Sequence, residues 1–293
     1  MFIQMFNGWY FFWLILSVAT IALLYFVLRG KSERRQKMVL FGILVFALLL
    51  HFLKVYIPPY SVDYARMLRD SWFINICGAN IALFPFLFWS KNDNVKDYMF
   101  YIGVISGLIA LFYPQEPLAK VDQLAEQLDI IRFYFHHWTL LAVPMLMAML
   151  KIHCPSYRRV LVAPTGLLIL MLFIMLNQIF QSELGFIPMR DSENFLGIGY
   201  KNTSYIWGPG KNDFIGKFLA KFTPDIFKTV PVGQYAGREK YWPWFWLIVP
   251  AYHLVTPMAA AIAVVADRKS IMADIRKLKE KLNGKKKLPV HIV

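Results

Sequence analysis

Seven apolar stretches that are long enough, or nearly long enough, to cross a lipid bilayer constrain this chain more than any other feature. A membrane-spanning helix needs about 20 mainly apolar residues. The candidate spans are residues 9–28, 38–57, 72–90, 98–113, 130–150, 160–180 and 244–266. With 58% hydrophobic and only 17% charged residues, the chain is too apolar for a water-soluble globule. The sequence therefore predicts an all-α, multi-pass bundle of about seven spans, integral to the cell membrane.

The stretch 98–113 is the shortest of the seven and carries Gly103 and Gly107. Small residues four positions apart lie on one face of a helix and allow a neighbouring helix to approach closely. We therefore expect this span to pack tightly against another one.

The distribution of Lys and Arg predicts the orientation of the bundle, because short cytoplasmic loops carry an excess of these residues. With the N-terminus outside, the inner segments hold 19 basic residues and the short outer segments hold 3. The inner segments are 29–37, 91–97, 151–159 and 267–293, and the short outer ones are 1–8, 58–71 and 114–129. The sequence thus predicts an outer N-terminus and a cytoplasmic C-terminus.

Two segments lie outside the predicted spans. The bundle, residues 1–266, includes a long outer loop at 181–243, in which the spacing of apolar residues predicts a helix over 214–222. Residues 267–293 form a basic tail, whose amphipathic pattern predicts a helix on the inner leaflet that binds anionic lipids. A cytosolic coiled-coil stub is the alternative. The concentration of basic charge beside the last span favours a membrane surface over a nucleic acid as its partner. The apolar face of this tail consists of Ile271, Ile275, Leu278 and Leu282.

Polar residues within the predicted spans gather in their outer halves, about 6–13 Å from the outer ends at 1.5 Å per residue. They are His51, Cys77, His137, Asn177 and His253. Polar side chains inside a membrane are costly and therefore suggest function. Their common depth predicts one polar pocket that opens to the outer side.

Cys77 and His137 are the candidates for chemistry in this pocket. A cysteine is nucleophilic as a thiolate, so it needs a base or a positive neighbour, and His137 at similar depth could serve as that base. The alternative is that Cys77 is a small buried packing residue. Asn177 or Gln178 could polarise a carbonyl, although a hydrogen bond between helices would explain either residue equally well.

Three further histidines could likewise have either a functional or a packing role. His51 and His253 could bind a substrate or only join neighbouring helices. His136 and His137 are adjacent, so their side chains point about 100° apart on a helix and cannot both face one pocket. The sequence contains neither His-x-x-x-His nor Cys-x-x-Cys, and it has no Gly-rich nucleotide loop. We therefore predict no metal site and no cofactor.

Several segments together resemble the YwaF family of integral membrane proteins. Residues from Trp72 to Gly78 resemble its third-span segment that ends in cysteine, and residues from Arg132 to His137 resemble its aromatic run that leads to a histidine. The other similar segments are Asn177, Tyr205 with Pro209, and residues 241–245. The sequence departs from that family in the three residues 72–74, in the separation of Asn202 from Tyr205, and at 211–240, which resemble an insertion.

The resemblance implies a function, because that family includes a eukaryotic transmembrane acyltransferase that makes ether phospholipids. It implies that Cys77 is the nucleophile and His137 the catalytic histidine, with membrane phospholipid as the substrate. We assign Asn177 to oxyanion stabilisation. The residues assigned to substrate binding are His51, Asn80, His136, Gln178, Tyr205 and His253. The alternatives are a transporter or lipid-binding protein that uses the same pocket without chemistry, and a structural membrane protein.

Overall fold

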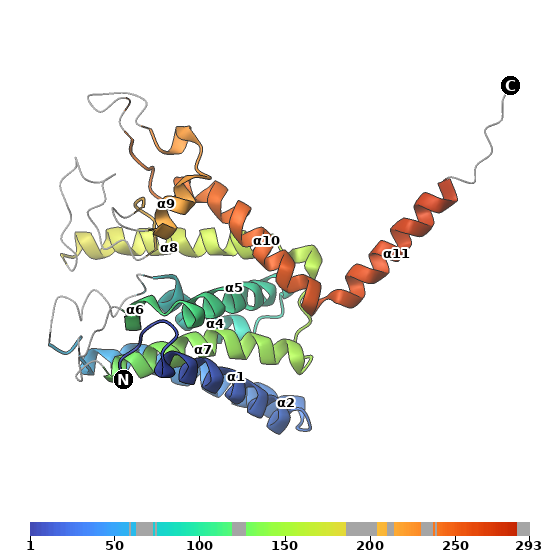
Figure 1. Ribbon diagram of the computed structural model, residues 1–293, viewed down its shortest axis with the longest axis horizontal. Helices are drawn as coiled ribbons and strands as arrows, with labels where there is room; N and C mark the ends of the chain where they lie inside the picture. Colours follow the sequence, from blue (N-terminus) through green and yellow to red (C-terminus); the bar gives the residue numbers. More distant parts are fainter. Residues whose placement is uncertain are drawn as a thin grey trace.

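Helices make up the regular structure in the residues that the structure describes. The computed structural model describes residues 1–58, 60–62, 73, 75–118, 127–185, 204–209, 214–229, 237 and 239–285. Over these ranges the chain is all-α without a strand, apart from one isolated bridge between Thr229 and Glu239 (Figure 1). The α-helices are α1 (Gly8–Leu28), α2 (Glu33–Leu53), α4 (Ile76–Phe88), α5 (Asp93–Phe112), α6 (Gln115–Leu118), α7 (Gln127–Met149), α8 (Val162–Glu183), α9 (Phe214–Ala220), α10 (Ile248–Ala266) and α11 (Arg268–Lys285). Short 3₁₀ helices are η1 (Lys54–Tyr56), η3 (Tyr157–Arg159), η5 (Asp225–Phe227) and η6 (Phe245–Leu247).

Five helical segments in the described ranges are long and apolar enough to cross a membrane. They contain α1, α2, α5, α8 and α10. α4 is also apolar but has only 13 residues, and α7 has 23 residues that include buried polar side chains. The prediction of an all-α membrane protein is thus confirmed, whereas seven crossings and their orientation stay predictions.

Two helices begin at other residues than the predicted apolar stretches, in ways that matter for the site. The predicted stretch 98–113 is only part of α5, which begins at Asp93 after the capping residue Asn92 and has 20 residues. The predicted stretch 72–90 begins at Trp72, which lies outside the described residues. Its helix α4 begins only at Ile76, because the side-chain oxygen of Asn75 accepts a hydrogen bond from Gly78 N at 2.6 Å and caps the first turn.

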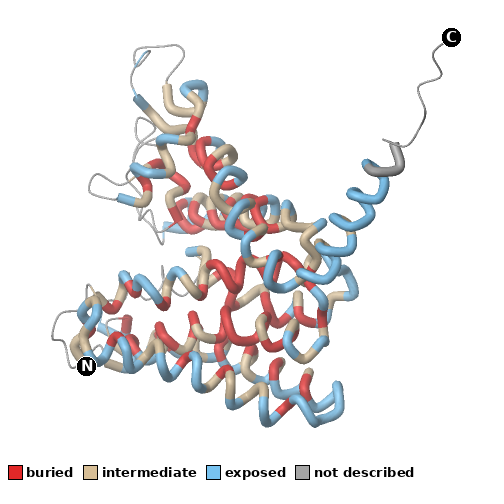
Figure 2. The backbone as a smooth tube through the Cα atoms, turned by 45° about the vertical axis from the view of Figure 1, so that its right-hand side comes forward, coloured by how far each residue is buried: buried red, intermediate tan, exposed pale blue. Residues whose placement is uncertain are grey.

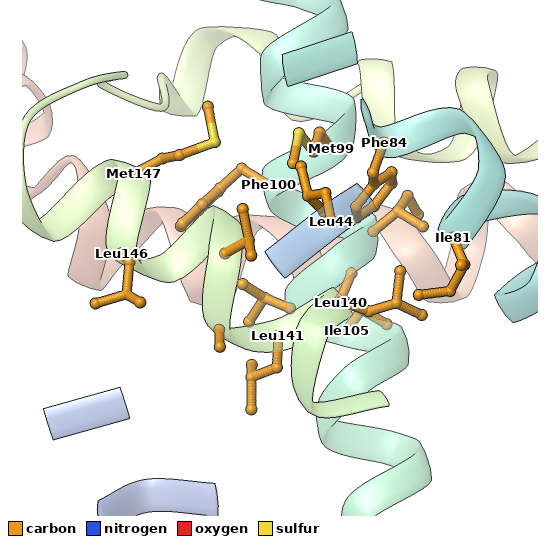
Figure 3. Close-up of a cluster of buried hydrophobic side chains, with 14 of the residues drawn as sticks. Leu44, Ile81, Phe84, Met99, Phe100, Ile105, Leu140, Leu141, Leu146 and Met147 are labelled. Carbon is orange, nitrogen blue, oxygen red and sulfur yellow. The ribbon is translucent and has the colours of Figure 1, made fainter. Parts of the chain in front are cut away.

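α5 is the central helix, in contact with α1, α4, α7, α8 and α10. The prediction of a tight approach is confirmed: a Cβ on Gly103 would lie 2.5 Å from Leu140 O of α7, and one on Gly107 would lie 2.7 Å from Leu141 Cβ. The backbones of α5 and α7 can meet only because these two positions carry no side chain. Around this contact, Leu, Ile, Phe and Met side chains of α2, α4, α5 and α7 form the main core (Figure 3).

A buried ion network holds one end of the bundle, which the sequence predicts to be the inner one. Asp97 of α5 accepts hydrogen bonds from His153 Nε2 at 2.6 Å, from Arg159 Nε at 2.5 Å and from Ser156 N at 3.3 Å. These partners all lie in the connection between α7 and α8, so one carboxylate fastens that connection to α5.

A second, smaller core joins α8 and α10 to residues 204–209. Trp246 is fully buried there, and its indole N–H donates to Tyr205 O at 2.9 Å. α11 leaves the end of α10 and projects away from the bundle, exposed along most of its length (Figures 1 and 2).

Candidate functional site

Cys77 lies in the first turn of α4, at the second residue of the helix. The backbone N–H groups of a first turn point out of the helix, toward any negative charge that develops nearby. The side chain is partly buried, and it forms no hydrogen bond in the part of the chain that the structure describes. This position differs from the sequence prediction, which placed Cys77 about 9 Å along a longer helix.

A cluster of aromatic and histidine rings lies beside this turn. His51 near the end of α2 stacks on Phe73 with 5.2 Å between the ring centroids, and on His136 of α7 with 6.2 Å. The His51 ring also lies next to Gly78, the residue that follows Cys77. A Cβ atom added to Gly78 would be 3.1 Å from His51 Cε1. The start of α4 and the N-terminal part of α7 thus meet at His51.

Arg132 connects this cluster to buried acidic and polar groups. Its Nε donates to Asp129 Oδ1 at 2.5 Å, one Nη donates to the Tyr60 hydroxyl at 3.3 Å, and the other lies 3.2 Å from His136 Nδ1. The carboxylate of Glu116 lies 3.7 Å away. Both Asp129 and Arg132 are almost completely buried, so the ion pair fixes the guanidinium beside His136.

His137 has separate contacts, as the 100° rule predicted for adjacent helical residues. Its Nδ1 lies 2.8 Å from the carbonyl oxygen of Phe133, and its ring packs on the Phe133 ring with 4.1 Å between centroids. The ring is buried.

The contacts of Gly103 show how α4 and α7 are aligned along the bundle. A Cβ there would lie 3.1 Å from Phe84 Cε2 of α4 and 2.8 Å from Pro144 Cγ of α7. Cys77 precedes Phe84 by seven residues, and His137 precedes Pro144 by seven, which is about two helical turns in each case. Because the two helices are in contact and run in the same direction, Cys77 and His137 come to a similar depth.

An apolar groove of about 730 Å³ lies between α4, the beginning of α5 and α8. At the end of the groove where α4 begins, the lining includes Phe73, whose ring also stacks on His51. Its walls include the small residues Ala79 and Ala82 of α4 and Gly166 of α8, against which the Tyr98 ring packs. The other lining residues are Leu83, Phe86, Leu87, Asn94, Val95, Tyr98, Leu161, Val162, Thr165, Ile169, Leu170 and Phe173. A groove of this size and apolarity is suited to a hydrocarbon chain.

Two predicted amides lie at the border of the cluster and the groove. Asn177 of α8 donates a hydrogen bond to Phe73 O at 3.4 Å. Asn80 of α4 is fully buried and accepts a hydrogen bond from the Tyr98 hydroxyl at 2.8 Å. Both amides therefore join elements that line the groove.

The other predicted residues belong to the second core or to the surface. Gln178 accepts a hydrogen bond from Trp207 Nε1 at 2.7 Å. Tyr205 has a positive φ of 59° and contacts the second core. His253 is exposed on α10, with its Nδ1 3.0 Å from Val249 O. α10 packs mainly on α8 and α5, whereas His51 and His136 lie where α2 meets α7, so the structure does not bring His253 into their cluster.

Sequence reasoning missed Asp129 and Arg132 as part of this cluster. Their spacing was a usable signal, because Asp129, Arg132 and His136 recur at intervals of three and four residues and therefore share one helix face. Only the fold, however, brings Tyr60 and His51 to that face.

Comparison with known proteins places the chain in a family. No curated protein and no solved structure matches it. The profile of the TMEM164 family matches residues 5–208, which is more than two thirds of the chain and includes Cys77 and both histidines of α7. The chain therefore belongs to the TMEM164 family, a family of transmembrane proteins.

Proposed function

We propose that this protein is a membrane acyltransferase or transacylase that moves acyl chains between phospholipids by way of a thioester on Cys77. The observation that carries the proposal is the position of Cys77. It lies in the first turn of α4, beside the ring cluster of His51 and His136, at the depth of His137. The resemblance to the YwaF family, with its ether-phospholipid acyltransferase, supports the same assignment.

The first step is transfer of the acyl group to the protein. His137 Nε2 takes the thiol proton of Cys77 while the sulfur attacks the carbonyl carbon of a phospholipid ester. A C–S bond forms, the C–O bond to the glycerol breaks, and the proton on His137 passes to the departing oxygen. The products are an acyl thioester on Cys77 and a lysophospholipid.

The second step returns the thiol. The hydroxyl group of a second lipid gives its proton to His137 and attacks the thioester carbonyl. The C–S bond breaks, the sulfur takes the proton back from His137, and the acyl group has moved to the acceptor. Water as the acceptor would make the same residues a lipid hydrolase.

The apolar groove between α4 and α8 supports a lipid substrate. Its end at Phe73 lies against His51 of the cluster, and the groove extends from there along α4 to Leu161 and Asn94 at the other end. An acyl chain that lies in the groove would bring its ester end toward the first turn of α4. Asn177, bonded to Phe73 O, would then lie near the carbonyl.

A transporter or lipid-binding protein is the second candidate, and the groove itself favours it, because a groove can hold a lipid without chemistry. The two candidates differ in covalent chemistry. Only the acyltransferase forms a thioester on Cys77.

The test is an acyl-transfer assay with purified protein in proteoliposomes that contain a labelled phospholipid donor and a lysophospholipid acceptor. We expect Cys77→Ala to abolish transfer and the trapped, hydroxylamine-sensitive acyl-protein adduct. Cys154→Ala is the matched control, because Cys154 is the other free cysteine and is exposed in the connection between α7 and α8. Full transfer activity in Cys77→Ala would refute the assignment.

We also propose that the tail binds anionic lipids. α11 is largely exposed and carries Lys and Arg on one side, with the apolar face at Ile271, Ile275, Leu278 and Leu282 on the other. A spin label on Met272→Cys, in a Cys154→Ser background, should lie deeper in nanodiscs with anionic lipids than in neutral ones. Equal depth in both would contradict this proposal.

A further inference from the structure

His136 and His137 are neighbours in the chain, yet their hydrogen bonds assign them opposite neutral tautomers. We infer that His136 supplies, through Nε2–H, the hydrogen bond that stabilises the oxyanion of the tetrahedral intermediate, while His137 supplies the basic nitrogen. The inference rests on the proposed acyl transfer and adds a role that the sequence had given to Asn177.

The tautomer of His136 follows from its partner. Arg132 can only donate hydrogen bonds, so the His136 Nδ1 that lies 3.2 Å from its Nη must be an acceptor and carries no proton. The proton of the neutral ring is therefore on Nε2. This nitrogen is buried, and it has no hydrogen-bond partner in the part of the chain that the structure describes.

A buried N–H group that forms no hydrogen bond lowers the stability of a protein, and most buried N–H groups do have a hydrogen-bond partner. Here the ring that bears it stacks on His51, whose Cε1 lies beside Gly78 at the start of α4. A carbonyl oxygen of a substrate held near Cys77 is a suitable acceptor. The unused donor is thus explained by a ligand with a carbonyl or another acceptor oxygen.

Arg132 is the positioning residue for this donor. Its guanidinium is fixed by Asp129 at 2.5 Å and by the Tyr60 hydroxyl at 3.3 Å, so it cannot turn away from His136. The ion pair keeps the His136 proton on Nε2 and also holds the plane of the ring.

The tautomer of His137 follows in the same way. A backbone carbonyl can only accept, so Nδ1, at 2.8 Å from Phe133 O, carries the proton. Nε2 of His137 is therefore the basic nitrogen. This assignment revises the expectation that the two rings cannot serve one pocket: about 100° apart on α7, they would approach a substrate from different sides. His137 would move the proton at the sulfur, and His136 would donate to the oxyanion and keep its own proton.

Each of the two amides that were predicted for the oxyanion forms a hydrogen bond with another group of the protein. Asn177 donates to Phe73 O at 3.4 Å, and Gln178 accepts from the indole of Trp207 at 2.7 Å. Among the described residues, His136 Nε2–H is a buried donor of the cluster that forms no hydrogen bond, whereas Asn80 Nδ2, which is also without a partner, belongs to a side chain whose oxygen is held by Tyr98.

The test uses substitutions that imitate one tautomer. Glutamine places an amide N–H near the position of Nε2 but carries no basic nitrogen. In the proteoliposome assay, His136→Gln should keep the rate of thioester formation within about tenfold, and His136→Ala should lower it about 100- to 1,000-fold. His137→Gln should abolish it. An inactive but folded His136→Gln, or an active His137→Gln, would overturn the assignment.

A second measurement is independent of activity. Nitrogen-15 NMR of histidine-labelled protein, with resonances assigned through His136→Gln and His137→Gln, reports which ring nitrogen carries the proton. We expect a protonated Nε2 in His136 and a protonated Nδ1 in His137. The reverse pattern would refute the inference even if Cys77 is catalytic. If the histidines show the expected protonation pattern but the unmodified protein transfers no acyl groups, the proposed function is refuted instead.

Discussion

His51 and His136 stack across the contact of α2 with α7, with 6.2 Å between their ring centroids and 28° between their planes. They are 85 positions apart in the chain, and each is buried. One ring touches the start of α4 near Cys77, and the other is fixed by Arg132. This relationship joins three helices into one candidate site.

The close approach of α5 and α7 should not tolerate a side chain at Gly103. A Cβ there would lie 2.5 Å from the Leu140 carbonyl oxygen, so Gly103→Ala must push the helices apart and should cost about 1–3 kcal/mol of stability. Thermal unfolding in detergent measures this cost. Gly42→Ala is the matched control in α2, where a Cβ would meet no atom within 4 Å. Equal melting temperatures for the two variants would contradict the packing described here.

Removal of the buried carboxylate of Asp129 should be strongly destabilising. Asp129→Asn leaves the buried guanidinium of Arg132 without its nearest counter-charge, a change that costs about 3–5 kcal/mol in buried pairs. The pair of the exposed Asp225 with Lys228 has the same spacing of three residues. Asp225→Asn should therefore change stability by less than about 1 kcal/mol. Unfolding midpoints of the two variants provide the comparison, and a mild effect at Asp129 would show that the pair is not buried as described.

A large side chain in the groove should exclude an acyl chain. Ala82 lines the groove on α4, so Ala82→Trp should fill much of its volume and raise the KM for the phospholipid donor at least tenfold. Ala19→Trp is the control, because Ala19 is exposed on α1 and lines no part of the groove. Crosslinking to α4 and α8 with a photoreactive acyl chain should fall in the first variant and stay unchanged in the second. Undiminished crosslinking in Ala82→Trp would place the lipid elsewhere.

The angle between α11 and the bundle should be insensitive to pH near neutrality. Hydrogen bonds from Tyr157 and then Arg158 lower the pKa of Asp274 below its ordinary value. A lowered carboxyl pKa means that the contact is complete above the ordinary value of about 4 and is lost only as the pH falls through the lowered one. Distances between spin labels on α11 and α8 should stay constant from about pH 8 to pH 5. Asp274→Asn should reproduce the acidic state at neutral pH, and an unchanged distance in that variant would show that another contact holds α11.

The sequence by itself determined the class of the protein, because the length of an apolar run is a local property that the bilayer thickness dictates. It also determined that Gly103 and Gly107 allow a close helix contact and that His136 and His137 diverge, since both follow from the helical repeat. The tertiary structure decided which residues meet. Local periodicity cannot show that Tyr60 and His51 come to the face of α7, or that His253 lies elsewhere.

The beginning of α4 also separates what the sequence determines from what the tertiary structure decides. Apolar content alone suggested a helix from residue 72, but the Asn75 cap starts it at Ile76 and leaves Cys77 in the first turn. The tautomers of His136 and His137 likewise depend on which groups lie opposite each ring nitrogen. A sequence states which side chains can donate or accept a proton, whereas only their arrangement in space determines which of them do.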